Sequence, residues 1–147
     1  MSIQSFFTDK EKLQITNAIK AAELETSGEV RVHIEGHCSG KQVLDCAAFW
    51  FKKLKMHKTA LRNGVLFYLA VNDHQFAVLG DIGINAKVPD DFWDEIKERM
   101  LAHFKKDEFA LGLDEGIRMA GEQLQTHFPY QDDDINELPD DISFGKN

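Results

Sequence analysis

The sequence has no long apolar run, only two cysteines and three prolines in 147 residues, and fewer cationic than anionic side chains. No stretch approaches the ~18 consecutive apolar residues of a membrane-spanning helix, and the N-terminus lacks the basic and apolar regions of a signal peptide. We therefore expect no membrane span and a cytoplasmic location. Cys38 and Cys46 match no zinc-binding spacing, and we expect both to be thiols in a reducing compartment.

The shortage of cations leaves a formal net charge of −8. This charge argues against a nucleic acid partner, because phosphate backbones bind basic surfaces, whereas it is compatible with binding cations. Residues 130–147 hold five Asp, one Glu and one Lys, a net charge of −5. We predict one domain over residues 1–129, followed by an acidic and loosely attached tail over residues 130–147.

Apolar periodicity predicts the elements of this domain. Thr8 and Glu11 have the spacing of a capping box, which begins a helix over residues 9–26. Alternation over residues 29–35 predicts a strand with one buried face. The remaining elements are a helix over about 40–55 capped by Ser39, a fully buried strand over 64–71, a returning strand over 75–79, a helix that follows Pro89-Asp90-Asp91 and runs to about 104, and a helix over about 107–127.

The order of these elements predicts the fold class. A strand, a helix and a second strand form a parallel pair with a right-handed crossover. Helices before and after a sheet with a buried central strand give three layers. We predict an α/β protein, a three-layer α/β/α sandwich with a small mixed sheet of about four strands. The fourth strand is expected either from residues 86–88 or from the tail.

Four oxygen-bearing side chains are predicted to meet at one edge of this sheet. Asp81 follows the third strand, and Asn63 precedes the second, which runs antiparallel to it. If the next loop folds back, Asp90 and Asp91 reach the same place. Because oxygen-only ligands select hard cations, we expect these four residues to bind Ca²⁺ or Mg²⁺.

Simpler roles exist for the same acids and stay open at this point. Asp90 or Asp91 at the start of a helix is explained by N-capping alone. Arg62 or Lys87 can neutralise Asp81 without any metal ion. Acids in exposed loops are common in any protein.

Four motifs occur in a specific order: SGEVRVHIE, RNGVLFYLAV, FAVLGDIGINAKVPDDFW and HFKKDEFALGLDEGI. Over about residues 5–128 the chain resembles the TPM domain family, named after thylakoid, photosystem II repair and membrane-associated modulator proteins. It looks like a stand-alone bacterial member. The resemblance implies an α/β/α sandwich. Members have been linked to acid phosphatase activity, photosystem repair and receptor modulation, and some bind calcium, so the resemblance implies no single reaction.

We expect a small soluble divalent-metal-binding protein whose metal-ordered loops regulate contact with an unknown protein partner. The alternative is a weak metal-assisted acid phosphatase built on Asp81 with Asp90 or Asp91. No general base stands out for such an enzyme, since His57 is only a loop candidate, and the catalytic residues stay unassigned. A third hypothesis is an interaction module that acts through the acidic tail and a sheet edge.

Overall fold

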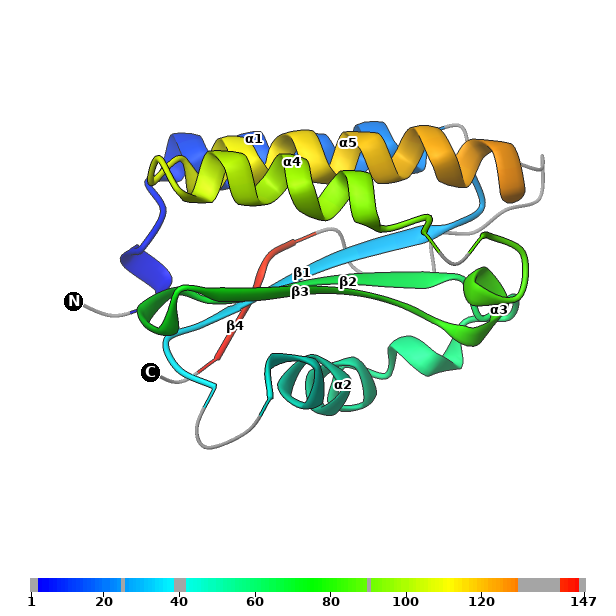
Figure 1. Cartoon of the computed structure of the whole chain (residues 1–147), viewed down its shortest axis with the longest axis horizontal. Helices are drawn as coiled ribbons and strands as arrows, with labels where there is room; N and C mark the ends of the chain where they lie inside the picture. Colours follow the sequence, from blue (N-terminus) through cyan, green and yellow to red (C-terminus); the bar gives the residue numbers. More distant parts are fainter. Residues whose placement is uncertain (1–2, 25, 39–41, 90, 130–140, 146–147) are drawn as a thin grey trace.

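The computed structural model describes residues 3–24, 26–38, 42–89, 91–129 and 141–145. Helices cover both faces of the sheet (Figure 1). The helices of the first face are α1 (Asp9–Glu23), α4 (Asp94–Phe104) and α5 (Phe109–His127), α2 (Val43–Lys53) lies on the second face, and α3 (Ile82–Asn85) follows the sheet at one end. Short 3₁₀ segments span Ile3–Ser5, Met56–Lys58 and Val71–Asp73.

Within the described residues the sheet has four strands, in the order β3-β2-β1-β4. They are β1 (Glu29–Glu35), β2 (Gly64–Ala70), β3 (Gln75–Gly80) and β4 (Ser143–Phe144). β1 is parallel to β2 and β4, and β2 is antiparallel to β3. The predicted α/β/α sandwich with a mixed four-stranded sheet is therefore confirmed. The fourth strand comes from the C-terminal segment, one of the two predicted sources.

The domain division at residue 129 stays a prediction. Of the predicted tail, the structure describes only residues 141–145. Ile142 is buried in the core beside β4. This short segment therefore belongs to the packed body of the protein.

Two apolar clusters, one on each face of the sheet, form the core. The larger cluster joins α1, α4 and α5 to alternate residues of β1 and β2, with Val32 and Phe67 fully buried. The smaller cluster joins α2 to the other face of β2 through Leu66 and Tyr68. The continuous apolar sequence of β2 follows from this arrangement, because helices cover a central strand on both sides.

The prediction that β1 has only one buried face is wrong. Its alternation indicated one polar and solvent-facing side, but Glu29, His33 and Glu35 are all buried. The polar side of the strand faces the layer of α2, where His33 stacks on Trp50. These three polar residues of β1 therefore lie inside the protein and need partners there.

The helix boundaries follow the predicted signals only in part. The capping box of α1 is present, since Thr8 Oγ1 accepts from the Glu11 backbone and Glu11 Oε1 accepts from the Thr8 backbone. Ser39, the predicted cap of α2, lies outside the described residues. α4 begins after Trp93, so Asp91 is not its N-cap. None of the helices that the structure describes is long and apolar enough to cross a membrane.

The two cysteines form a disulfide, so the expectation of free thiols is wrong. Cys38 follows β1 and Cys46 lies in the first turn of α2, with their Cα atoms 6.0 Å apart. The separation of eight residues spans the connection from β1 to α2, which brings the two cysteines within bonding distance. It is not the spacing of a zinc motif. Disulfides persist mainly in oxidising compartments, so this bond does not support the expected cytoplasmic location. That location stays an expectation.

Candidate functional site

A buried carboxylate lies where β3 ends. Asp81 is only 5% exposed. Its two oxygens accept from the guanidinium of Arg62, at 2.8 Å from Nε to Oδ2 and 2.9 Å from Nη2 to Oδ1. The Arg62 side chain is 40% exposed, so the pair joins a buried anion to a cation at the surface. The hydrogen bond to Asp81 raises the pKa of Arg62, which stays charged.

The same carboxylate begins α3, a helix that the sequence did not predict. Asp81 Oδ1 accepts from the backbone N–H of Ile82 at 2.7 Å, as an N-cap side chain does. Two backbone bonds hold this turn against the start of β2 and the loop before it, from Asp81 N to Gly64 O at 3.0 Å and from Gly83 N to Arg62 O at 2.9 Å. The segments before β2 and after β3 therefore form one joined structure.

The backbone of Arg62 adopts a conformation that glycine or asparagine would adopt more easily. Its φ is 51°, in the left-handed region. Non-glycine residues pay about 1 kcal/mol or more there. An arginine at this turn is therefore explained by its side chain, which neutralises Asp81, and not by the local backbone.

The structure brings together some of the four predicted ligands and separates others. Asn63 lies beside Asp81 as predicted, since Asp81 N bonds to the next residue, Gly64. The side-chain amide of Asn63, however, donates to Ser27 O at 3.0 Å. The two residues lie on adjacent backbone segments, but their side chains bind different partners, Ser27 O and Arg62.

The other two predicted ligands lie elsewhere or outside the structure. Asp90 is outside the described residues. Asp91 lines an acidic hollow of about 550 Å³ with Asp94, Glu95 and Glu98, and this hollow shares no lining residue with the one beside Asp81. Among the described residues, no group of three or more His, Cys, Asp or Glu is placed to hold a metal ion. The assignment of these four residues as ligands stays a prediction.

A second polar cluster lies on the buried polar side of β1. Glu35 Oε2 accepts from Trp50 Nε1 at 3.0 Å and from the hydroxyl of Tyr68. Burial, and then this hydrogen bond, raises the pKa of Tyr68 above its ordinary range. The carboxylate therefore ties β1 to β2 and to α2 at once.

His33 lies in the same cluster and is fully buried. Its ring stacks on Trp50 with centroids 3.9 Å apart, and its Nδ1 lies 2.9 Å from Ser143 Oγ of β4. Its Nε2 is buried and has no hydrogen-bond partner in the described part of the chain. Burial, and then the nearby Arg31, lowers the pKa of His33 to about 4, so the imidazole is neutral at physiological pH.

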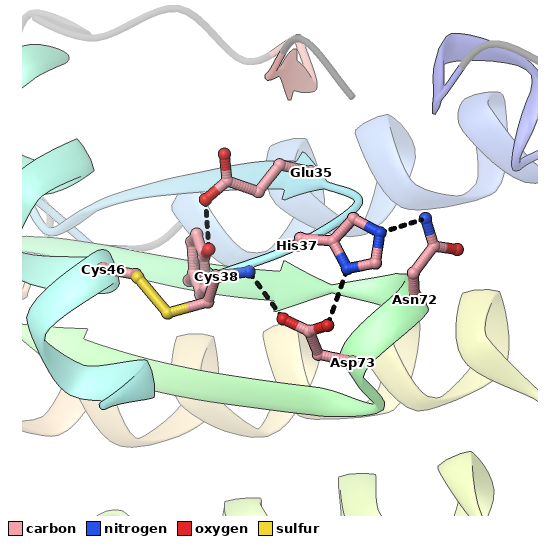
Figure 2. A network of polar contacts seen from close by, with 7 residues as sticks. Glu35, His37, Cys38, Cys46, Asn72 and Asp73 are labelled. Carbon is pink, nitrogen blue, oxygen red and sulfur yellow. Dashed lines mark hydrogen bonds and ion pairs between the residues drawn. A yellow bond between two sulfur atoms is a disulfide. The ribbon is translucent and has the colours of Figure 1, made fainter. Parts of the chain in front are cut away.

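Figure 2 shows the next polar contact along the chain, in which Asp73 lies between His37 and the backbone of Cys38. The distances are 2.7 Å from His37 Nδ1 to Asp73 Oδ1 and 2.6 Å from Cys38 N to Asp73 Oδ2. The backbone N–H of Cys38, and then His37, lowers the pKa of Asp73. A carboxylate that orients an imidazole also occurs in catalytic sites, but both cysteines are in the disulfide, which leaves no thiol to activate.

Sequence reasoning missed the buried cluster and the disulfide. One signal was available, because a neighbouring strand that is apolar on both sides requires cover on both faces of the sheet. The same cover must then bury the second side of β1. For the disulfide, no sequence pattern beyond the two cysteines themselves indicated that they pair.

Comparison with known proteins identifies the family. The model of the TPM domain matches residues 3–123, which is most of the chain. The chain belongs to the TPM domain family. No functionally curated protein matches this TPM domain.

Solved structures support the fold of this TPM domain. The NMR structure of the BA42 protein from the psychrophilic bacterium Bizionia argentinensis is 48% identical, covers 97% of this chain and 98% of that one, and superposes with a TM-score of 0.91. An N-terminal domain from P. gingivalis (17% identity, 83% and 78% covered, TM-score 0.67) and that of cg2496 from Corynebacterium glutamicum (10%, 97% and 82%, 0.66) share the fold alone.

Proposed function

We propose that this TPM domain binds a divalent cation, Ca²⁺ or Mg²⁺, and that the ion binds Asp81 in exchange for Arg62. The observation that carries the proposal is the asymmetry of the Arg62–Asp81 pair. The carboxylate is buried, whereas the side chain that neutralises it is 40% exposed. A guanidinium at the surface can move into solvent, and a cation from solvent can then take its place beside the carboxylate.

The chemistry of the surrounding loops supports a hard ion. Asp81 offers two carboxylate oxygens, and the side chain of Asn63 lies on the adjoining loop. Asp90 and Asp91 are the remaining predicted ligands and lie on the segment that follows α3. Carboxylate, amide and backbone oxygens are the donors that Ca²⁺ and Mg²⁺ prefer. Ion binding requires Asp91 to leave its hollow, so the segment before α4 is expected to rearrange.

A titration of Ca²⁺ followed by amide NMR shifts tests this proposal. We expect shifts concentrated in residues 57–64 and 80–92, because these segments carry the exchanging Arg62 and the predicted ligands. Asp81→Asn keeps an N-cap for α3 but removes the charge, so it should abolish the response. Asp114→Asn is the matched control, since Asp114 also pairs with an arginine, Arg118, within α5.

The outcomes separate three hypotheses. Shifts in 57–64 and 80–92 that disappear in Asp81→Asn and persist in Asp114→Asn support the proposal. Shifts confined to residues 130–141 instead locate cation binding in the acidic segment. The absence of any response to Ca²⁺ or Mg²⁺ rules out the cation site and favours an interaction module.

The alternative, a weak metal-assisted acid phosphatase, depends on the same ion. One observation favours it, because the planar guanidinium of Arg62 presents donors that fit phosphate oxygens. Cation-dependent hydrolysis of a generic phosphomonoester at acid pH, lost in Asp81→Asn, would support it. Ca²⁺ binding without turnover would leave the non-catalytic function in place.

A further inference from the structure

A hollow of about 480 Å³ lies beside the Arg62–Asp81 pair, between α2, β3 and α3. Apolar side chains from all three elements line it, namely Phe51, Leu79 and Ile82. Ile82 is 62% exposed, and Leu61 of the adjoining loop is 50% exposed. Exposed aliphatic side chains beside an apolar concavity are typical of surfaces that bind another molecule.

The charge around this hollow is opposite to that of the whole protein. Residues 46–72 contain no Asp or Glu and five Lys or Arg, although the chain carries a net charge of −8. Lys52, His57 and Arg62 line the hollow itself. Asp81 is the one carboxylate among the described residues that line it, and it is already paired with Arg62. A local positive field therefore favours an acidic partner.

Hydrogen-bond donors remain available at the hollow. Arg62 uses Nε and Nη2 on Asp81, which leaves its Nη1 for another acceptor. A carboxylate can therefore be bound here without breaking the Arg62–Asp81 pair, so this inference does not depend on cation binding.

We propose that this hollow docks a short acidic peptide segment of a partner protein, with an apolar side chain in the hollow and an adjacent carboxylate on the basic rim. A concave, apolar surface of this size accommodates a side chain, and the basic rim selects the acidic neighbour. A hollow of about 480 Å³ can receive a single protruding apolar side chain, which a peptide offers and a flat bilayer surface does not. Peptide binding is thus favoured over a membrane surface.

The test uses the full chain in EDTA and a fluorescent probe peptide with a central Leu-Phe pair flanked by two Glu on each side. We expect Ile82→Ser and Lys52→Glu each to weaken binding about tenfold, since one removes apolar contact and the other reverses a rim charge. Both residues are exposed, so the fold should be unaffected. The controls are Lys20→Glu in α1 and Leu24→Ser at the residue after it, which make equivalent changes at exposed positions. Both variants should bind the peptide as the wild type does.

Specific weakening in the two hollow variants, with binding retained in the two controls, supports the proposal. Failure of the peptide to bind, or equal binding by all five proteins, overturns it. A parallel measurement uses vesicles of phosphatidylserine and phosphatidylcholine. Vesicle binding that depends on Ile82 and Lys52 while the peptide does not bind would also overturn it, in favour of a membrane surface. Because EDTA removes divalent cations, no outcome depends on the proposed ion site.

Discussion

Replacing Gly83 by alanine is expected to destabilise the protein by about 3 kcal/mol or more. A Cβ at this position would lie 2.1 Å from Leu61 O and 2.5 Å from Arg62 O. Both are backbone atoms, so the clash is relieved only if α3 and the loop before β2 move apart. That movement also breaks the bond from Gly83 N to Arg62 O. Urea unfolding, monitored by circular dichroism, measures the loss.

Gly28→Ala is the matched control for this substitution. The nearest atoms to a Cβ at residue 28 are side-chain atoms, a Leu124 methyl at 3.2 Å and then its second methyl and Thr26 Oγ1. A leucine side chain can shift by a few tenths of an ångström, so we expect a change within about 1 kcal/mol. Equal losses for the two substitutions would show that the close contact between α3 and the loop is not what holds the site together.

Lowering the pH from 7 to about 4 is expected to remove about 3 kcal/mol of stability through His33 alone. Burial lowers the pKa of His33 from 6.5 to about 4. Between these values the unfolded chain binds a proton that the folded chain does not. The contribution of neutral His33 is therefore fully present above pH 6.5 and is lost as the pH falls towards 4.

Several polar and charged side chains face the His33 imidazole. A variant without a titratable ring separates the contribution of His33 to the pH dependence from theirs. Arg31 and Glu35 lie on the same strand, Tyr68 on the next, and Ser143 on β4. His33→Phe keeps an aromatic ring against Trp50 but cannot titrate. Urea unfolding at pH 7 and 4.5 should therefore show a smaller pH effect in this variant than in the wild type, with the exposed His74→Asn as control. An identical pH dependence in His33→Phe would contradict the assignment.

The fold could be predicted from the sequence because its signals are local. The capping box of α1 and the apolar run of β2 each indicate one structure, and both are observed. The burial of β1 on both sides is different, because its alternating sequence is also that of a half-exposed strand. Only the position of α2 over His33 and Glu35 decides between the two, and that position is a tertiary fact.

The position of the candidate site in the fold was predictable from the sequence, but its side-chain contacts were not. The antiparallel β2–β3 pair brings residues 63 and 81 together, as topology requires. Which cation neutralises Asp81 depends on side-chain geometry, and Arg62 reaches it through a left-handed turn that no sequence pattern signalled. The hollow beside the pair is formed by three separate elements, so sequence spacing alone could not reveal it.

In the proposed cation exchange, Arg62 occupies the position of a cation at Asp81. Calorimetric titration of Ca²⁺ into the wild type and Arg62→Gln tests it most directly, because glutamine removes the competing charge and leaves both oxygens of Asp81 in place. We predict that Arg62→Gln binds Ca²⁺ at least about threefold more tightly, in line with the modest strength of partly exposed ion pairs. Unchanged or weaker binding in the variant, or no heat of binding in either protein, would contradict it.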